Sequence, residues 1–442
     1  MSSSYKKREV CLWGVLSILT ALLPVLVVAK GRLQDDMEHE AIQYLKAEPT
    51  DPIIQLQKEI DAGRVKLEFD KKNGYLRSVL KNLHISTTSQ ALTFAKTSLQ
   101  RERINPRQPR ALYFNDQTYI GFVQDSPLLE ISSTDPQLGG TFYLLPQMPV
   151  AKPKFVRQNY ECLQCHSGSL TNGVSGHIMR SVYPRLDGQP EFRAGTHLTS
   201  DQSPFSERWG GWFVTGKHGF MRHLGNVMAT GDGETILMDK EAGANITQLN
   251  SLVDTSPYLT PYSDIVALMV LGHQVNLHNL ITRANWHTRM ALHYEKQLNK
   301  ELGRPEGSHL DSTLSRIRSV CEPLVQGLLF SKAEPLPCTI TGTSGYTEAF
   351  SKQGGYDKKG RNLREFDLKK RLFKYPCSYL IYSPEFSALP PMAKEYTYRR
   401  LWQVLSGTDK SADFASLSES ERTSIREILC DTKPEFVQYK PQ

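Results

Sequence analysis

The chain has 442 residues, of which 39% are hydrophobic and 22% are charged, and its formal net charge is +7. This mild positive charge, without any groove-reading motif, argues against a nucleic-acid-binding protein. The sequence contains no internal repeat, which excludes repeat architectures.

The chain begins with a basic stretch followed by an uncharged one. Lys6, Lys7 and Arg8 precede an apolar run, 11–29, that ends in Val-Val-Ala. This order is typical of a signal peptide. The run is also about long enough to span a bilayer. We therefore expect residues 1–29 to be either a cleaved signal peptide or an anchor in the inner membrane, and the protein to be periplasmic or otherwise extracytoplasmic.

The next region is expected to be rich in strands. Residues 30–60 are polar and predict a linker that runs into a short helix. Between about 90 and 150, apolar runs alternate with turn residues such as Asn115-Asp116, which predicts an antiparallel meander. Strands are expected again at 177–183 and 209–215. Residues 61–260 are thus expected to form a β-rich region.

This region contains the most informative motif of the chain, Cys162-Leu163-Gln164-Cys165-His166. Two cysteines three positions apart, followed at once by histidine, form the spacing that attaches haem c. Each thiol can add across one vinyl group of the haem, and His166 can bind the iron as proximal ligand. We expect one covalent haem c, in a loop cradled between β elements.

Two other uses of paired cysteines fit the context less well. A thioredoxin-like pair needs a strand before the motif and a helix opening on its first cysteine. Here the approach, 153–160, is only weakly strand-like, and the exit, 167–169, is typical of a loop. A tetrahedral zinc site needs four ligands, whereas the next cysteine is Cys321.

A long helix is predicted from Tyr262 to Leu302. Apolar residues recur there at helical spacing on one stripe, which also includes His273 and His287. A second helix is expected from His309 to Phe330.

Two more helices are expected near the C-terminus. Pro390-Pro391 opens one that ends at Gly407, and Ser418 with Glu421 forms a capping box for the other, 423–429. Residues 261–442 are therefore predicted to be mainly helical and packed on region 61–260. The predicted fold class is α+β.

The motif leaves the distal position of the iron open. The richest cluster of donors lies in the glycine-flanked loop 216–226. In order of preference, the candidates are His223 and His218, then Met221, then His273 or His287. The remaining donors are His177, Met179, His197 and Met269. Most histidines are expected to be structural, and an open distal position is the alternative.

Basic side chains suggest two further roles. Arg193, Arg208 and Arg222 are candidates to bind the haem carboxylates, since a guanidinium suits a carboxylate. Segment 358–374 contains eight Lys or Arg residues. It would suit an acidic redox partner, although a solvated basic surface is the commoner role of such a run.

Four cysteines remain beyond the motif, namely Cys321, Cys338, Cys377 and Cys430. In an oxidising compartment they would allow up to two disulfides. Their spacing does not select a pairing, and unpaired buried thiols are the alternative.

Three stretches, 162–184, 203–226 and 371–390, resemble a group of large, exported, single-haem bacterial proteins with a cytochrome c domain signature and no assigned activity. The resemblance runs from about residue 50 to the end, which implies one unit. It implies haem-binding roles for Cys162, Cys165 and His166, and names neither a distal ligand nor a substrate.

Three functions remain open. The first is electron transfer to and from a redox partner protein. The second is a haem enzyme, peroxidase-like or oxygenase-like, in which His218, His223 or Arg222 acts on a bound oxidant. The third is a haem-based sensor or scaffold. The chain is about four times longer than a simple single-haem domain of about 100 residues, which argues for more than a shuttle.

Overall fold

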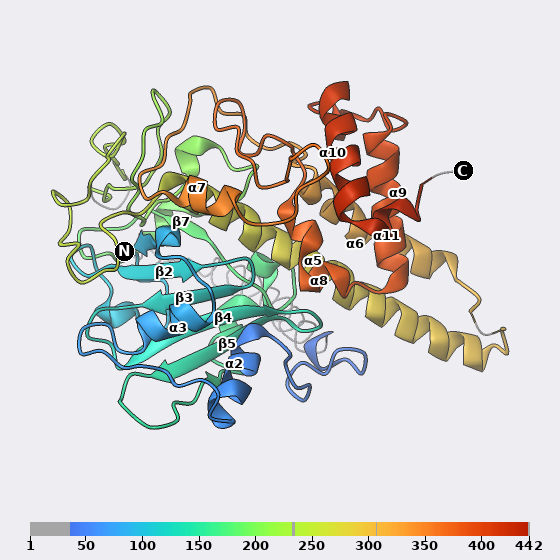
Figure 1. Cartoon of the computed structure of the whole chain (residues 1–442), viewed down its shortest axis with the longest axis horizontal. Helices are drawn as coiled ribbons and strands as arrows, with labels where there is room; N and C mark the ends of the chain where they lie inside the picture. The colour runs from blue at the N-terminus through green and yellow to red at the C-terminus, as the bar shows by residue number, and fades with distance from the viewer. Residues whose placement is uncertain (1–35, 232–234, 306, 441–442) are drawn as a thin grey trace, which may run out of the picture.

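The computed structural model describes residues 36–231, 235–305 and 307–440 (Figure 1). The expected signal peptide or anchor, 1–29, lies outside these residues. The short helix predicted at the end of the linker is α2 (Pro52–Asp61), which begins after Asp51 because that carboxylate accepts hydrogen bonds from the amides of Ile53 and Ile54.

Six antiparallel strands follow, and neighbours in the sheet are neighbours in the sequence. They are β1 (Ala91–Thr93), β2 (Arg110–Phe114), β3 (Thr118–Phe122), β4 (Leu128–Asp135), β5 (Gly139–Pro146) and β6 (Val156–Arg157). At the β2–β3 turn the side chain of Asn115 accepts hydrogen bonds from the amides of Gln117 and Thr118. The predicted antiparallel meander is confirmed.

The two faces of this sheet differ in how they are covered. One face presents Tyr113, Ile131 and Tyr143, all buried beneath α2 and α3 (Leu76–Asn82). Burial of each such side chain contributes about 1.5–3 kcal/mol, so this face stabilises the sheet. Alternate residues point to the opposite face, which the long helix α5 covers only in part.

Helix α5 (Ile265–Glu301) is the long helix predicted from the apolar stripe. It begins after Asp264, whose carboxylate accepts hydrogen bonds from the amides of Val266 and Ala267. Among the described helices it alone is long and apolar enough to cross a membrane, yet 94% of its most apolar window is buried inside the protein. It is therefore the central core helix (Figure 1).

The C-terminal half is helical, as predicted. Helix α6 (Asp311–Leu328) packs on α5, α9 (Pro391–Leu405) contacts both of them, and α10 (Glu419–Thr432) packs on α9. The capping box of Ser418 and Glu421 forms. It starts α10 at Glu419, four residues before the predicted start, because the box itself lies within the first helical turn.

Strands resume in a hairpin of β7 (Arg180–Val182) and β8 (Thr196–Leu198). The strand predicted at 209–215 is wrong, because that segment makes only isolated bridges. The backbone of Trp209 has φ 65°, and a Cβ on Gly210 would lie 2.0 Å from the carbonyl oxygen of Val182. Because the backbone turns at Trp209 and lies close to β7 at Gly210, the segment does not form the continuous hydrogen-bond ladder of a strand.

Among the cysteines that the structure describes, none forms a disulfide, and Cys321 and Cys377 are buried. Their thiols pack with the apolar side chains of the main core. The described structure therefore matches the alternative of unpaired thiols.

Candidate functional site

The pentapeptide 162–166 forms a single helical turn. Helix α4 spans Leu163–His166, and the amide of His166 donates to the carbonyl oxygen of Cys162 at 3.0 Å. Positions i, i+3 and i+4 of a helix share one face, so Cys162, Cys165 and His166 lie together. Leu163, in contrast, is 7% exposed and packs with Trp286, which fixes the turn on the protein.

The His166 ring is held by one hydrogen bond and one ring contact. Its Nδ1 lies 2.9 Å from the carbonyl oxygen of Gly176 and donates to it. Its centroid lies 4.7 Å from that of Phe142 on β5. Nε2 forms no hydrogen bond with any described residue. Desolvation lowers the pKa of His166, so the ring is neutral and Nε2 presents a lone pair.

A glycine is required at position 176. A Cβ there would lie 2.1 Å from the side-chain oxygen of Asn279 on α5. The same side chain accepts a hydrogen bond from the amide of His177 and donates one to its carbonyl oxygen. Helix α5 thus positions the carbonyl group that orients His166.

The two cysteines are free thiols in this structure. Cys165 is exposed and Cys162 is half-buried. Burial raises the pKa of the Cys162 thiol to about 11, helped by the nearby charge of Glu130. A thioredoxin-like pair instead relies on a cysteine whose pKa is lowered. The environment of Cys162 therefore does not favour that alternative.

Beside α4 lies a part of the sheet that α5 leaves uncovered. The register places Leu112 opposite Gly121, Gly121 opposite Glu130 and Glu130 opposite Leu144. We call this surface the open face, and it consists of Arg110, Leu112, Gly121, Glu130 and Leu144. All but Gly121 keep part of their surface exposed. Phe142 precedes Leu144 by two residues and therefore points to the same face of the sheet. Because its ring contacts His166, the open face continues directly to His166.

An ion pair crosses the open face. The Nη2 atom of Arg110 on β2 lies 3.0 Å from a carboxylate oxygen of Glu130 on β4. The guanidinium passes over β3, where a Cβ on Gly121 would lie 2.4 Å from Nη2. The other Glu130 oxygen accepts a hydrogen bond from the amide of Gln100. Gly121 thus makes room for the pair.

A second guanidinium approaches from the hairpin, that of Arg180. The charges of Arg110 and Arg180 add to the lowering of the His166 pKa, and that of Glu130 opposes it, so all three groups lie near the ring. The Nε atoms of both arginines are buried and have no hydrogen-bond partner among the described residues.

These residues fit a haem. The apolar macrocycle matches Leu112 and Leu144, and the carboxylates match guanidinium groups whose hydrogen-bonding capacity the protein does not fill. Within the described ranges, no group of three or more His, Cys, Asp or Glu side chains converges to hold a bare metal ion. Haem attachment does not require such convergence, because the two thiols bond to carbon and only His166 approaches the metal.

The arginines proposed from the sequence differ in what they contact. Arg208 donates to the carbonyl oxygens of Asp201 and Ser203, and Arg222 is paired with Glu241 at 2.7 Å. Arg193 is exposed on the hairpin. The hydrogen bonds of Arg208 and Arg222 give these two residues local roles.

The preferred distal candidates form a cluster of their own. His218 and His223 have ring centroids 4.7 Å apart, and both contact Phe205. His223 also contacts Trp209 at 5.3 Å. These ring contacts are not with the pentapeptide, so the loop 216–226 brings the two histidines to each other and to the core.

The nitrogen atoms of these histidines differ in availability. His218 uses both, with the carbonyl oxygen of Met221 at 2.8 Å and the amide of Asn245 at 2.9 Å. His223 accepts a hydrogen bond from the amide of Gly225 at Nδ1, and its Nε2 is buried without a partner among the described residues. Of the two, His223 alone keeps a free nitrogen.

The other candidates are embedded in the core or in hydrogen bonds. Met221, Met179 and Met269 are 5%, 2% and 5% exposed, respectively. His273 uses both nitrogens, one 2.6 Å from Asp201 and the other 2.7 Å from Ser378. The remaining two are partly exposed, namely His197, which lies 3.2 Å from Glu207, and His287.

A buried polar network runs from this site to α5. His177 contacts Phe142 at 6.2 Å and Tyr119 at 4.7 Å. Its Nε2 is hydrogen-bonded to Thr134, and the Tyr119 hydroxyl accepts from Gln274. A cavity of about 20 Å³ lies at the Gln274 end, far too small for a macrocycle. It lies away from the pentapeptide.

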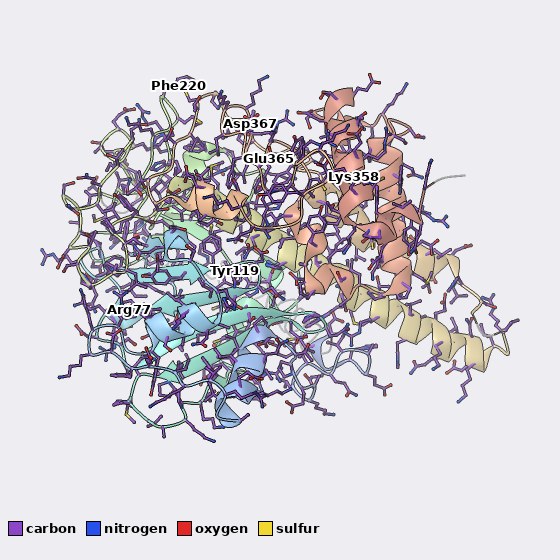
Figure 2. All side chains as sticks on the ribbon, in the orientation of Figure 1. Arg77, Tyr119, Phe220, Lys358, Glu365 and Asp367 are labelled. Carbon is purple, nitrogen blue, oxygen red and sulfur yellow. The ribbon has the colours of Figure 1, made fainter. Side chains whose placement is uncertain are left out.

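The basic segment 358–374 is largely neutralised within the chain. Six of its eight basic residues form ion pairs, namely Lys358, Lys359, Arg361, Arg364, Arg371 and Lys374. Figure 2 shows Lys358, Glu365 and Asp367 on the segment drawn above the sheet that carries Tyr119. The pairing fits a solvated surface better than a docking site for an acidic partner.

The chain matches no family model, no curated protein and no solved structure.

Proposed function

We propose that the chain is an exported c-type cytochrome with one haem, covalently attached at Cys162 and Cys165 and ligated by His166, that transfers electrons. A bound haem would supply the Fe(III)/Fe(II) couple. The supporting observation is that three side chains of the required types share one face of α4, while the Gly176 carbonyl holds the proton of His166 on Nδ1. This leaves Nε2 free for a metal.

The chain's own residues would each have a defined task in this function. Leu163 fastens α4 to the protein, and Phe142 excludes water from one side of the His166 ring. Asn279 holds the loop that carries Gly176. We propose that β2 to β5 on one side and the β7–β8 hairpin on the other form the cradle of the haem loop.

The compartment and partners follow from the same proposal. Haem c is attached outside the cytoplasm, and the segment 1–29 would export the chain as a signal peptide or hold it at the inner membrane. The partner would be a redox protein. The ion pairing of segment 358–374 supports contact through some other surface.

A second candidate function is a peroxidase-like or oxygenase-like haem enzyme. What favours it is an open distal position, because the printed ring contacts of His218 and His223 are with Phe205, with Trp209 and with each other, and not with the pentapeptide. The charged groups near His166 are instead Arg110, Glu130 and Arg180.

An absorption spectrum of the reduced, haem-loaded protein separates the two functions. A low-spin α band that carbon monoxide leaves unchanged supports electron transfer with a protein distal ligand. A high-spin iron that binds carbon monoxide contradicts that assignment and supports the enzyme. His223→Ala tests the preferred distal ligand, because it converts low-spin to high-spin iron only if His223 binds the metal.

A further inference from the structure

We propose that the loop 147–154, which follows β5, docks the protein on an anionic lipid surface. The tip of the loop would insert apolar side chains at the boundary between headgroups and acyl chains, and the lysines around it would contact the anionic headgroups. This inference does not rest on haem attachment, because it involves no residue of the pentapeptide 162–166.

The tip of the loop is apolar and exposed. Met148 and Val150 are 63% and 52% exposed, and their neighbours Pro149 and Ala151 are exposed as well. Single exposed apolar residues are ordinary on protein surfaces, whereas adjoining ones mark an interaction site. Insertion at a lipid surface would remove these side chains from water.

The fold holds this tip in place. The hydroxyl of Tyr75, just before α3, donates to the carbonyl oxygen of Met148 at 3.0 Å and accepts from the amide of Val150 at 3.0 Å. The amide of Tyr75 donates to the side chain of Gln147 at 2.9 Å. Its ring also contacts that of Phe69, which is partly exposed, at a centroid distance of 5.0 Å. Because the loop is already ordered, little conformational entropy is lost when it binds.

The loop is fastened to the segment 58–81, which runs from the end of α2 through α3. Lys154 lies 2.6 Å from the carboxylate of Asp61, and Lys152 donates to the carbonyl oxygen of the same residue at 2.8 Å. Tyr75 provides the second connection. The loop and this segment therefore form one surface, which we call the basic face.

The basic face has an excess of positive charge. It contains nine basic residues and four acidic ones. A fifth acidic residue, Asp254, lies close by, because its carboxylate and Lys72 bind the amide and the carbonyl oxygen of Ser256. Six of the lysines are exposed and form no ion pair with any described residue, namely Lys58, Lys66, Lys71, Lys72, Lys81 and Lys152.

The combination favours a lipid surface over an acidic protein. Anionic headgroups attract each nearby basic side chain, and the layer beneath them accepts apolar ones. A stable protein interface buries about 800 Å² on each partner, which is far more than a tip of four residues supplies. The segment 1–29, whether it is a signal peptide or an anchor, would also bring the chain to a membrane.

The test follows a tryptophan placed at the tip. Met148→Trp in the full chain is mixed with phosphatidylcholine vesicles, with or without phosphatidylglycerol, and the wild-type spectrum is subtracted. The tryptophans that the structure describes are at most 7% exposed, so they respond little. On anionic vesicles only, the added tryptophan should emit at shorter wavelength and lose its quenching by iodide. It reports on the loop itself, whether 1–29 is cleaved or anchors the chain.

Two matched controls accompany this measurement. Leu186→Trp, at a position 74% exposed between β7 and β8, should keep its emission on both kinds of vesicle. In the Met148→Trp chain, Lys66→Gln with Lys71→Gln should lower the equilibrium constant for insertion about fivefold for each lysine. Lys296→Gln with Lys300→Gln removes the same charge from exposed positions of α5 and should leave the constant unchanged.

Three results would overturn the inference. The first is an emission of Met148→Trp that anionic vesicles leave unchanged. The second is an equal shift on neutral and anionic vesicles, because the lysines would then have no part in binding. The third is a shift with polyglutamate but not with vesicles, which would indicate an acidic protein partner. Each of these results leaves the proposed haem attachment untouched.

Discussion

His166 Nδ1 lies 2.9 Å from the carbonyl oxygen of Gly176, and this bond selects the ring nitrogen that remains available to a metal. Ligating histidines commonly donate their second nitrogen to a carbonyl group in this way. Gly176 is itself held by α5, so the central core helix and the candidate site form one unit.

Replacing Asn279 tests this link. Asn279→Leu removes two buried hydrogen bonds to the backbone of His177 and leaves its amide and carbonyl groups unpaired. We expect the free energy of unfolding to fall by about 2–4 kcal/mol, measured by urea denaturation. Lys296→Ala, at an exposed position of the same helix, should change it little. Equal stability of wild type and Asn279→Leu would show that α5 does not support the loop.

A side chain at position 121 should disturb the open face. Gly121→Ala places a methyl group 2.4 Å from the Arg110 guanidinium, which must then leave Glu130. Because the guanidinium is the end of a flexible side chain, the expected cost is that of the weakened ion pair, about 0.5–1 kcal/mol in thermal or urea unfolding. Gly355→Ala is the control, because a Cβ there has no neighbour within 4 Å. If both variants are equally stable, Gly121 is not required for the ion pair.

Acid should destabilise the protein through His223. Burial, and secondarily the neighbouring His218, lowers the pKa of His223 to about 3. The unfolded chain takes up this proton near pH 6.5, so stability is fully present above that pH and is lost as the pH falls towards 3. Within this range, His223 alone changes the free energy of unfolding by about 1.4 kcal/mol per pH unit.

Unfolding of His223→Gln between pH 4 and 6 measures that contribution. Its free energy of unfolding should depend on pH less steeply than that of the wild type, by the slope of one proton. His84→Asn is the control, because His84 is exposed and asparagine tolerates its φ of 55°. Identical slopes for wild type and His223→Gln would contradict a buried neutral His223.

The buried pair of His278 and Glu385 gives a further prediction. The two groups lie 2.8 Å apart at 1% and 2% exposure, although neither finds good hydrogen-bond geometry at that contact. Glu385→Leu removes one partner and should destabilise the protein by about 3–5 kcal/mol. The double variant His278→Phe, Glu385→Leu should recover part of the loss. Additive losses in a double-mutant cycle would show that the two groups do not interact.

The elements in which apolar residues recur with a clear period were predictable from the sequence, whereas the surroundings of the 162–166 motif were not. The meander and α5 follow from local apolar patterns and turn residues. The contact between Arg110 and Glu130 depends on the register of three strands. In the sequence only Gly121, which leaves space for the Arg110 guanidinium, pointed to it. Arg180 lies on β7, and the pairing of β7 with β8 was not apparent from the local sequence.

Nearness in the sequence did not reveal how the preferred distal candidates pack. His218 and His223 follow the motif closely and lie on a glycine-flanked loop, but their rings turn towards Phe205 and Trp209. His273 sits on the apolar stripe of α5 because Asp201 and Ser378 satisfy both of its nitrogens. A histidine pattern alone does not reveal which nitrogens other groups already occupy.

Covalent attachment of haem decides whether 162–166 is a haem c site. The full chain is expressed with a haem c maturation system, denatured, and analysed by intact mass and by haem staining of a denaturing gel. If the haem is attached covalently, the mass increases by that of one haem, the increase survives acid acetone, and it is lost in the double variant Cys162→Ala, Cys165→Ala. A wild-type chain that releases all its haem into acid acetone would contradict covalent attachment.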